Sequence, residues 1–188
     1  SFATAKILQR FAVPIFEVIT PAVSSAVSSS KNFRFGVIGT RATVASGIYE
    51  KKIIEIQPAA KVYSIACPLL VPLVEEGWLH KPEAAMIVKK YLHPLKIRQI
   101  DTLILGCTHY PLLKKVIQRK MGRRVHLIDS SISVADKIKS FIENHVEVDK
   151  KLGKNGKLTL FASDITDQFE KLATMTLKTN VKFNGVKI

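Results

Sequence analysis

Asp101-Thr-Leu-Ile-Leu-Gly-Cys-Thr-His-Tyr-Pro111 joins an uncharged apolar run to a short cluster of reactive side chains. Residues 102–105 have the composition of a buried β-strand; the glycine that follows ends the strand, and the proline predicts the start of a helix. Cys107, Thr108 and His109 are therefore expected at a strand-to-helix turn. In open α/β sheets, ligands bind at turns of this kind, at the carboxyl ends of the strands.

Strand-like and helix-like segments alternate along the rest of the chain. Further strands are predicted at residues 13–19, 34–38, 61–66, 125–128 and 158–162. Helices are predicted at residues 22–27, 43–56, 82–91, 112–120 and 131–144, with another helix capped by Asp164. Such alternation is typical of parallel sheets covered by helices, so the expected fold class is α/β of the doubly wound type. The sequence has no G-x-G-x-x-G after a strand and no G-x-x-x-x-G-K-S/T, the marks of dinucleotide and P-loop nucleotide sites.

The composition indicates the broad class of protein. The chain has 188 residues, 47% of them apolar and 23% charged, which is typical of a globular protein with a substantial core. Two cysteines do not form a disulfide framework and indicate a reducing compartment. No apolar run reaches the length of about 18 residues that spans a bilayer, and the first residues show no signal-peptide pattern. A cytoplasmic location without membrane contact is expected.

The formal net charge of +14 raises the question of nucleic-acid binding, since a basic face attracts phosphates. The densest basic groups, within residues 119–124 and 150–157, are not interleaved with the aromatic side chains that stack on bases. We therefore expect no nucleic-acid partner beyond weak non-specific binding at low salt.

Two threonines follow the predicted strand at residues 34–38. Thr40 and Thr43 lie where the next helix is expected to begin, so their hydroxyls are predicted to cap its free backbone N–H groups. Contact with an anionic ligand at the same helix end is the second interpretation of these residues.

Three interpretations of the cluster of Cys107, Thr108 and His109 compete. The first is a buried cysteine beside a surface histidine, because free cysteine is among the most buried residue types; Cys67 is assigned that packing role. The second is a metal site, but Cys67, Cys107 and His109 lack the spacing of a zinc site, so no metal is expected. The third is thiol chemistry. An extended backbone places Cys107 and His109 on one face, and a nearby imidazole increases the thiolate fraction that nucleophilic or proton-transfer catalysis needs.

The stretch Leu105-Gly-Cys-Thr-His-Tyr-Pro-Leu-Leu113 resembles the second-cysteine signature of the cofactor-independent glutamate racemases, in the Asp/Glu racemase family. Ile38-Gly-Thr-Arg-Ala-Thr-Val-Ala-Ser-Gly-Ile-Tyr49 is similar to the Gly-Thr-x-x-Thr segment of that family, and Ala66-Cys-Pro-Leu-Leu-Val-Pro-Leu-Val-Glu75 to its Cys-Pro block. Residues 127–130 and 161–164 also follow in the family's order. The resemblance covers nearly all of the chain.

This resemblance implies racemisation of glutamate by two cysteines without a cofactor or metal, and a supply of D-glutamate for peptidoglycan synthesis. One thiolate takes the α-proton from one face of the substrate, and a second thiol returns a proton to the other face. By the motif match, Cys107 is one of the pair, His109 tunes its protonation and contacts the substrate, and Thr108 binds the α-carboxylate. Glutamate is the expected partner, and a homodimer is left open.

The motif of the family's other cysteine places that residue just before Ser1, and Ser1 itself is expected to contact the substrate. The family's fold has two pseudo-symmetric α/β lobes, and the first lobe is expected to be incomplete in this chain. Residues 1–17 are predicted to be a remnant of the first lobe, residues 18–126 the second lobe, and residues 127–188 the return to the first. With one cysteine of the pair, the chain alone is expected to be inactive. A non-catalytic binding or regulatory fragment and an aspartate racemase are the alternatives.

Overall fold

A four-stranded parallel sheet forms the centre of the molecule. The computed structural model describes residues 13–156, 158–177, 179 and 182–187. The strands of the sheet are β1 (Arg34–Gly39), β2 (Lys61–Ala66), β3 (Thr102–Gly106) and β4 (His126–Asp129). Their order is β2-β1-β3-β4, and all three neighbouring pairs are parallel. Since each crossover between these strands carries at least one helix, the predicted α/β class is confirmed.

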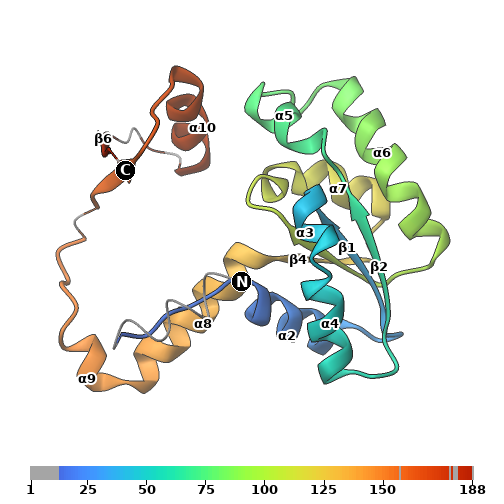
Figure 1. The fold of residues 1–188 in the computed structure, drawn as a ribbon, viewed down its shortest axis with the longest axis horizontal. Helices are drawn as coiled ribbons and strands as arrows, with labels where there is room; N and C mark the ends of the chain where they lie inside the picture. Colours follow the sequence, from blue (N-terminus) through green and yellow to red (C-terminus); the bar gives the residue numbers. More distant parts are fainter. Residues whose placement is uncertain (1–12, 157, 178, 180–181, 188) are drawn as a thin grey trace.

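Helices cover both faces of this sheet (Figure 1). One apolar cluster joins the sheet to α5 (Leu70–Glu75), α6 (Pro82–Ile97) and α7 (Lys114–Met121). The other joins the sheet to α2 (Ile19–Ser29) and α4 (Ile48–Ile56), and α8 (Ser130–Asn144) packs against α2. The strand β3 shows how the sequence specifies two layers: Leu103 and Leu105 belong to the first cluster and Ile104 to the second, as the alternation of side chains along a strand requires.

A second, smaller parallel sheet lies apart from the four-stranded sheet, at the upper left of the view in Figure 1. Its strands are β5 (Leu160–Ala162) and β6 (Phe183–Gly185), and α10 (Asp167–Leu177) connects them. The rings of Phe169 in α10 and Phe183 in β6 lie 4.8 Å apart. Leu172 in α10 packs against the apolar cluster that contains α5, so this unit contacts the larger sheet's helical layer. Among the described residues, no helix has the length and apolar character needed to cross a membrane.

The strand predicted at residues 13–19 is wrong. No strand occurs at residues 13–18, and α2 begins at Ile19. The Glu17 carboxylate accepts hydrogen bonds from the backbone N–H groups of Ile19 and Thr20, at 2.6 and 2.8 Å. A carboxylate in this position satisfies N–H groups that have no partner inside the helix, so the apolar residues before it lead into a helix.

Several helix bounds also differ from the prediction. The helix predicted at residues 43–56 is divided into α3 (Arg41–Ala45) and α4, because Gly47 adopts a left-handed conformation with φ +61°. The helix α6 continues to Ile97 through Pro94, an exposed position at which a single intrahelical hydrogen bond is lost.

Two further differences lie near the end of the chain. A short helix, α9 (Val146–Asp149), lies between residues 144 and 158, where no helix or strand is predicted. Asp164 does not cap α10, which begins at Asp167; the Thr166 hydroxyl accepts a hydrogen bond from the backbone N–H of Phe169 at 3.2 Å instead.

Candidate active site

The carboxyl ends of the parallel strands bring the predicted site residues to one edge of the sheet. Gly39 at the end of β1 pairs with Gly106 at the end of β3, so the Thr40 and Cys107 segments leave the sheet side by side. Gly39 also pairs with Ala66 of β2, after which the chain continues into Cys67. Parallel pairing therefore brings together segments that are far apart in the sequence.

The two glycines allow this close approach. A Cβ atom on Gly39 would lie 2.9 Å from Cγ2 of Thr43, and a Cβ on Gly106 would lie 2.9 Å from the backbone oxygen of Ile38. The ring of Tyr49 would be 3.2 Å from that second Cβ. A backbone oxygen cannot move aside as a side chain can. A larger residue at position 106 would therefore push β3 away from β1 and displace Cys107, which follows it.

Cys107, His109 and Glu75 form a continuous series of contacts. Sγ of Cys107 lies 3.9 Å from Nδ1 of His109, and Nε2 of His109 lies 3.4 Å from Oε1 of Glu75. The hydroxyl of Thr108 lies 3.3 Å from the same Nδ1 atom. The side chains of Cys107, His109 and Glu75 are at least partly exposed, which allows solvent and small molecules to reach them.

The local backbone corrects the geometry that the sequence suggested. His109 is helical (φ −80°, ψ −30°) and lies in a turn, so the condition of an extended backbone, under which the two side chains would share a face, is not met. The turn brings the two side chains together instead. The helix expected at Pro111 is a four-residue 3-10 helix, η1 (Tyr110–Leu113), and α7 begins only at Lys114. A turn this short supplies little helix dipole beside Cys107.

Thr40 caps the helix after β1 as the first interpretation predicts, whereas Thr43 lies inside that helix and is not a cap. The Thr40 hydroxyl accepts a hydrogen bond from the backbone N–H of Thr43 at 3.2 Å, and the two hydroxyls lie 2.9 Å apart. Thr40 thereby caps α3. Ser1, the remaining predicted contact with the substrate, lies outside the described residues.

Cys67, the other cysteine of the chain, has the packing role that the sequence predicts. Cys67 is fully buried in the apolar cluster under α5. Burial raises the pKa of its thiol to about 12, because the thiolate loses hydration there. The buried Tyr110 donates its hydroxyl proton to the backbone oxygen of Cys67 at 2.9 Å, and burial raises the pKa of that phenol. Tyr110 thus ties the turn after β3 to the end of β2.

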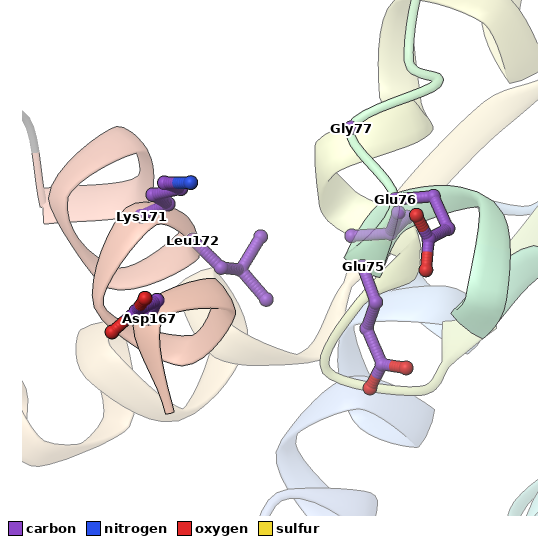
Figure 2. Close-up of a pocket in the computed structure, with 7 residues that line it drawn as sticks. Glu75, Glu76, Gly77, Asp167, Lys171 and Leu172 are labelled. Atoms are coloured by element: carbon purple, nitrogen blue, oxygen red, sulfur yellow. The ribbon is translucent and has the colours of Figure 1, made fainter. Parts of the chain in front are cut away.

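A cavity of about 530 Å³ opens beside His109. Glu75, Thr108 and His109 line one side, and Asp164, Thr166 and Phe169, from the segment that enters α10, line the other. A neighbouring cavity of about 500 Å³ shares Glu75 and Leu172 with it. Figure 2 shows Leu172 projecting from α10 toward the side of that cavity formed by Glu75, Glu76 and Gly77. Both cavities therefore lie between α10 and the helical layer of the larger sheet.

Sequence reasoning missed Glu75 as a site residue. Glu75 is the last residue of the Cys-Pro block, and this position was the one feature of the sequence that could have marked it as a site residue. Nothing in the neighbouring sequence connects it with His109, which lies 34 positions later. Asp164, Thr166 and Phe169 were likewise not assigned to a site. Within the described ranges, no group of three or more His, Cys, Asp or Glu side chains is arranged to hold a metal ion.

The sequence matches known proteins over most of its length. A model of the Asp/Glu/hydantoin racemase family matches residues 2–137. The glutamate racemase of Aquifex aeolicus is 41% identical over 182 residues, which is 97% of this chain and 67% of that protein. The glutamate racemase of Persephonella marina is 39% identical over 188 residues, 100% of this chain and 69% of the relative. The chain thus spans about two thirds of the length of such relatives.

Solved structures of similar fold point to the same group. A glutamate racemase isoform from Bacillus anthracis superposes with a TM-score of 0.87 at 32% identity, covering 98% of this chain and 69% of the other. The glutamate racemase of Francisella tularensis, solved in complex with D-glutamate, gives 0.85 at 31% identity, covering 97% and 68%. An aspartate racemase homologue from Pyrococcus horikoshii, at 18% identity and a TM-score of 0.58, shares the fold alone. The chain therefore belongs to the Asp/Glu/hydantoin racemase family.

Proposed function

We propose that this chain carries one half of the proton-transfer machinery of a glutamate racemase. Cys107 is the group that removes or returns the α-proton on one face of the substrate. The contact series from Cys107 through His109 to Glu75 is the observation that carries this proposal. The curated relatives that align with nearly the whole chain are glutamate racemases, and a solved relative binds D-glutamate.

The contacts of His109 suggest how the thiolate forms. Glu75 lies beside Nε2, which favours the tautomer with a proton on that atom and leaves Nδ1 to accept the thiol proton of Cys107. The product is a thiolate beside an imidazolium whose positive charge the Glu75 carboxylate partly offsets. His109 is in this way a positioning and proton-holding group for Cys107.

Inversion of the substrate then proceeds in two proton transfers. The Cys107 thiolate takes the proton from the α-carbon, and the electron pair left behind is delocalised into the α-carboxylate. An acid on the opposite face gives a proton to the same carbon, which restores the C–H bond with inverted configuration. For the other enantiomer the two groups exchange roles, so one site converts glutamate in both directions.

We propose that the opposing acid is not among the described residues. Cys67 does not fill this role, because it is fully buried and its thiol pKa is raised to about 12. The family resemblance makes the opposing group a second cysteine. The chain by itself is therefore proposed to be inactive as a racemase, since a single acid–base group acts on one face only.

The cavity beside His109, whose Nδ1 atom lies 3.9 Å from Sγ of Cys107, is proposed to form part of the binding site for glutamate. Thr108 is exposed and lines this cavity, which supports the proposal that its hydroxyl donates a hydrogen bond to the α-carboxylate of the substrate. His109 lines the same cavity and contacts the substrate there. A contribution from Ser1 is proposed on the family resemblance. Thr40 is proposed to act only as the cap of α3, and Thr43 only through its hydrogen bonds with Thr40.

The lobes are proposed to divide at a slightly different position from that expected. A boundary between residues 126 and 127 would cut β4, whose residues pair with β3 from Thr102 to Leu105. We therefore place the second lobe at residues 18–129, with residues 1–17 and 130–188 assigned to the first. A cytoplasmic homodimer that supplies D-glutamate for peptidoglycan synthesis is the proposed biological setting.

The test is a racemisation assay on the full-length gene product. Cys107→Ser is expected to lower turnover of both glutamate enantiomers by about 10³-fold, because the proton-transfer group on one face is lost. Cys67→Ala is the matched control, since it removes a buried thiol outside the site; it is expected to lower stability more than turnover. Chiral chromatography of glutamate and aspartate incubations gives both rates and separates glutamate from aspartate as the substrate. Racemisation by the Cys107 variant at the unsubstituted rate would refute the proposal.

A further inference from the structure

Positive charge is concentrated in one part of this chain. Residues 84–128 contain ten Lys and Arg residues and a single acid, Asp101, and so carry +9 of the formal net charge of +14. Asp101 is occupied elsewhere, because its carboxylate accepts hydrogen bonds from the Ser30 hydroxyl and from the backbone N–H groups of Lys31 and Asn32.

The fold places six of these ten cations along the junction of α6 and α7, which lie side by side (Figure 1). Two cavities of about 430 and 240 Å³ run along this junction and meet at Lys96. Basic side chains line both of them. We call the following set the basic furrow: Lys89, Lys96, Arg119, Lys120, Arg123 and Arg124.

No acidic side chain is paired with the cations of the basic furrow among the described residues. Across the part of the chain that the structure describes, none of these six side chains forms an ion pair. Repulsion among clustered cations opposes folding, so a cluster of this kind is typical of a surface that meets an anionic partner.

The basic furrow is separate from the candidate active site. It includes the turn before β4 and Ile100 just before β3, so it lies at the amino ends of the strands. Cys107 and His109 lie at the carboxyl ends. A ligand of the basic furrow therefore occupies the opposite edge of the sheet.

We propose that the basic furrow binds the phosphate backbone of double-stranded nucleic acid. Lys89 and Lys96 are seven residues apart in α6, about 10 Å along the helix, which matches about three phosphates of one strand. Arg119, Arg123 and Arg124 add guanidinium groups, which pair with phosphate oxygens in a bidentate way. The cations line two cavities that meet at Lys96 and so extend along the helix junction, an arrangement that suits a linear polyanion.

The aromatic residues of the same region determine the kind of nucleic acid. Tyr110 is fully buried and Tyr91 packs against the apolar core, so neither offers a free ring for stacking on unpaired bases. Binding is therefore independent of sequence and favours duplexes over single strands.

The experiment is fluorescence anisotropy with a mixed-sequence duplex of about 20 base pairs, at salt concentrations from about 50 to about 200 mM. The furrow variant combines Lys96→Gln, Arg119→Gln, Arg123→Gln and Arg124→Gln. The matched control combines Lys31→Gln, Lys51→Gln, Lys137→Gln and Lys150→Gln, which removes the same charge from exposed positions elsewhere. Thermal unfolding by circular dichroism compares the stabilities of both proteins with the unsubstituted chain.

The unsubstituted chain is expected to lose affinity about 100-fold over this salt range, as four or more phosphate contacts require. The furrow variant should bind at least about tenfold more weakly at low salt, with a salt slope reduced by about 3 to 4, while the control retains the slope. Equal weakening by the two variants would overturn the proposal, because total charge would then explain binding. Tighter binding to single strands, or to phosphatidylglycerol vesicles, would overturn it as well.

Discussion

The ends of β2 and β3 make an informative comparison, because each strand runs directly into a cysteine at the same edge of one sheet. Cys67 is fully buried in the apolar cluster under α5, and its thiol pKa is raised by that burial. Cys107 is partly exposed and contacts an imidazole that in turn contacts a carboxylate. A position at the end of a strand is therefore not enough to make a thiol reactive; the segment after it decides whether apolar or titratable side chains surround it.

The largest expected difference is in the rate of alkylation of the two thiols. Iodoacetamide is expected to modify Cys107 on the order of 100-fold faster than Cys67 in the folded chain, because alkylation needs an accessible thiolate. Peptide mapping by mass spectrometry during the reaction measures both rates in one sample. In denaturant the two rates should become similar. Comparable rates in the folded chain would remove the distinction between the two cysteines.

Alkylation also tests the contacts of His109. His109→Gln is expected to slow modification of Cys107 about tenfold, because the group that accepts the thiol proton is lost. Glu75→Gln should slow it by a smaller factor, about threefold, since the carboxylate acts only through the imidazole. The neighbouring Glu76→Gln serves as the control and should leave the rate unchanged. Equal effects of the two glutamate variants would mean that the Glu75 contact is not specific.

The smallest expected effect concerns the amino end of β3, which Asp101 ties to the turn before β1. Burial alone would raise the pKa of Asp101, but hydrogen bonds from Ser30, Asn32, Lys31 and Thr102 outweigh it and hold the pKa below its usual value. A carboxyl with a lowered folded-state pKa stabilises the fold above the unfolded pKa of about 3.9, and this stabilisation is lost as the pH falls through the folded value.

Asp101→Asn is accordingly expected to destabilise the chain at neutral pH by about 1 kcal/mol, since the amide accepts the same hydrogen bonds more weakly. The difference from the unsubstituted chain should disappear under acid conditions in which the carboxyl is protonated. Urea unfolding at several pH values measures this difference. A constant difference at every pH would show that the charge of Asp101 contributes nothing.

Local sequence patterns predict most of the larger sheet. The four strands are confirmed to within about one residue of their expected ends, because short apolar runs bounded by turn residues are a local signal. The strand predicted at residues 13–19 was wrong because the same local signal, a short apolar run, also occurs before a helix. Its apolar residues resemble a strand, but the Glu17 carboxylate ends the segment by capping α2.

Only the residues of the candidate site that are close together in the sequence were predicted. Cys107 and His109 were identified together because two positions separate them, although the backbone that joins them is a turn. Glu75 was not, because its distance from His109 depends on how α5 packs against η1. The basic groups of the sequence gave no reason to expect one surface, since Lys96 and Arg124 meet only when α6 and α7 pack.

The sequence by itself determined the α/β class, the buried role of Cys67 and the reactive cluster that contains Cys107, because strand composition and adjacent side chains are properties of short segments. Only the tertiary structure decided that a carboxylate faces His109 and that six cations share one furrow. The physical reason is that both arrangements depend on the order of parallel strands and on the packing of the crossover helices. These long-range contacts are set by the burial of apolar surface over the whole sheet, which no short segment specifies alone.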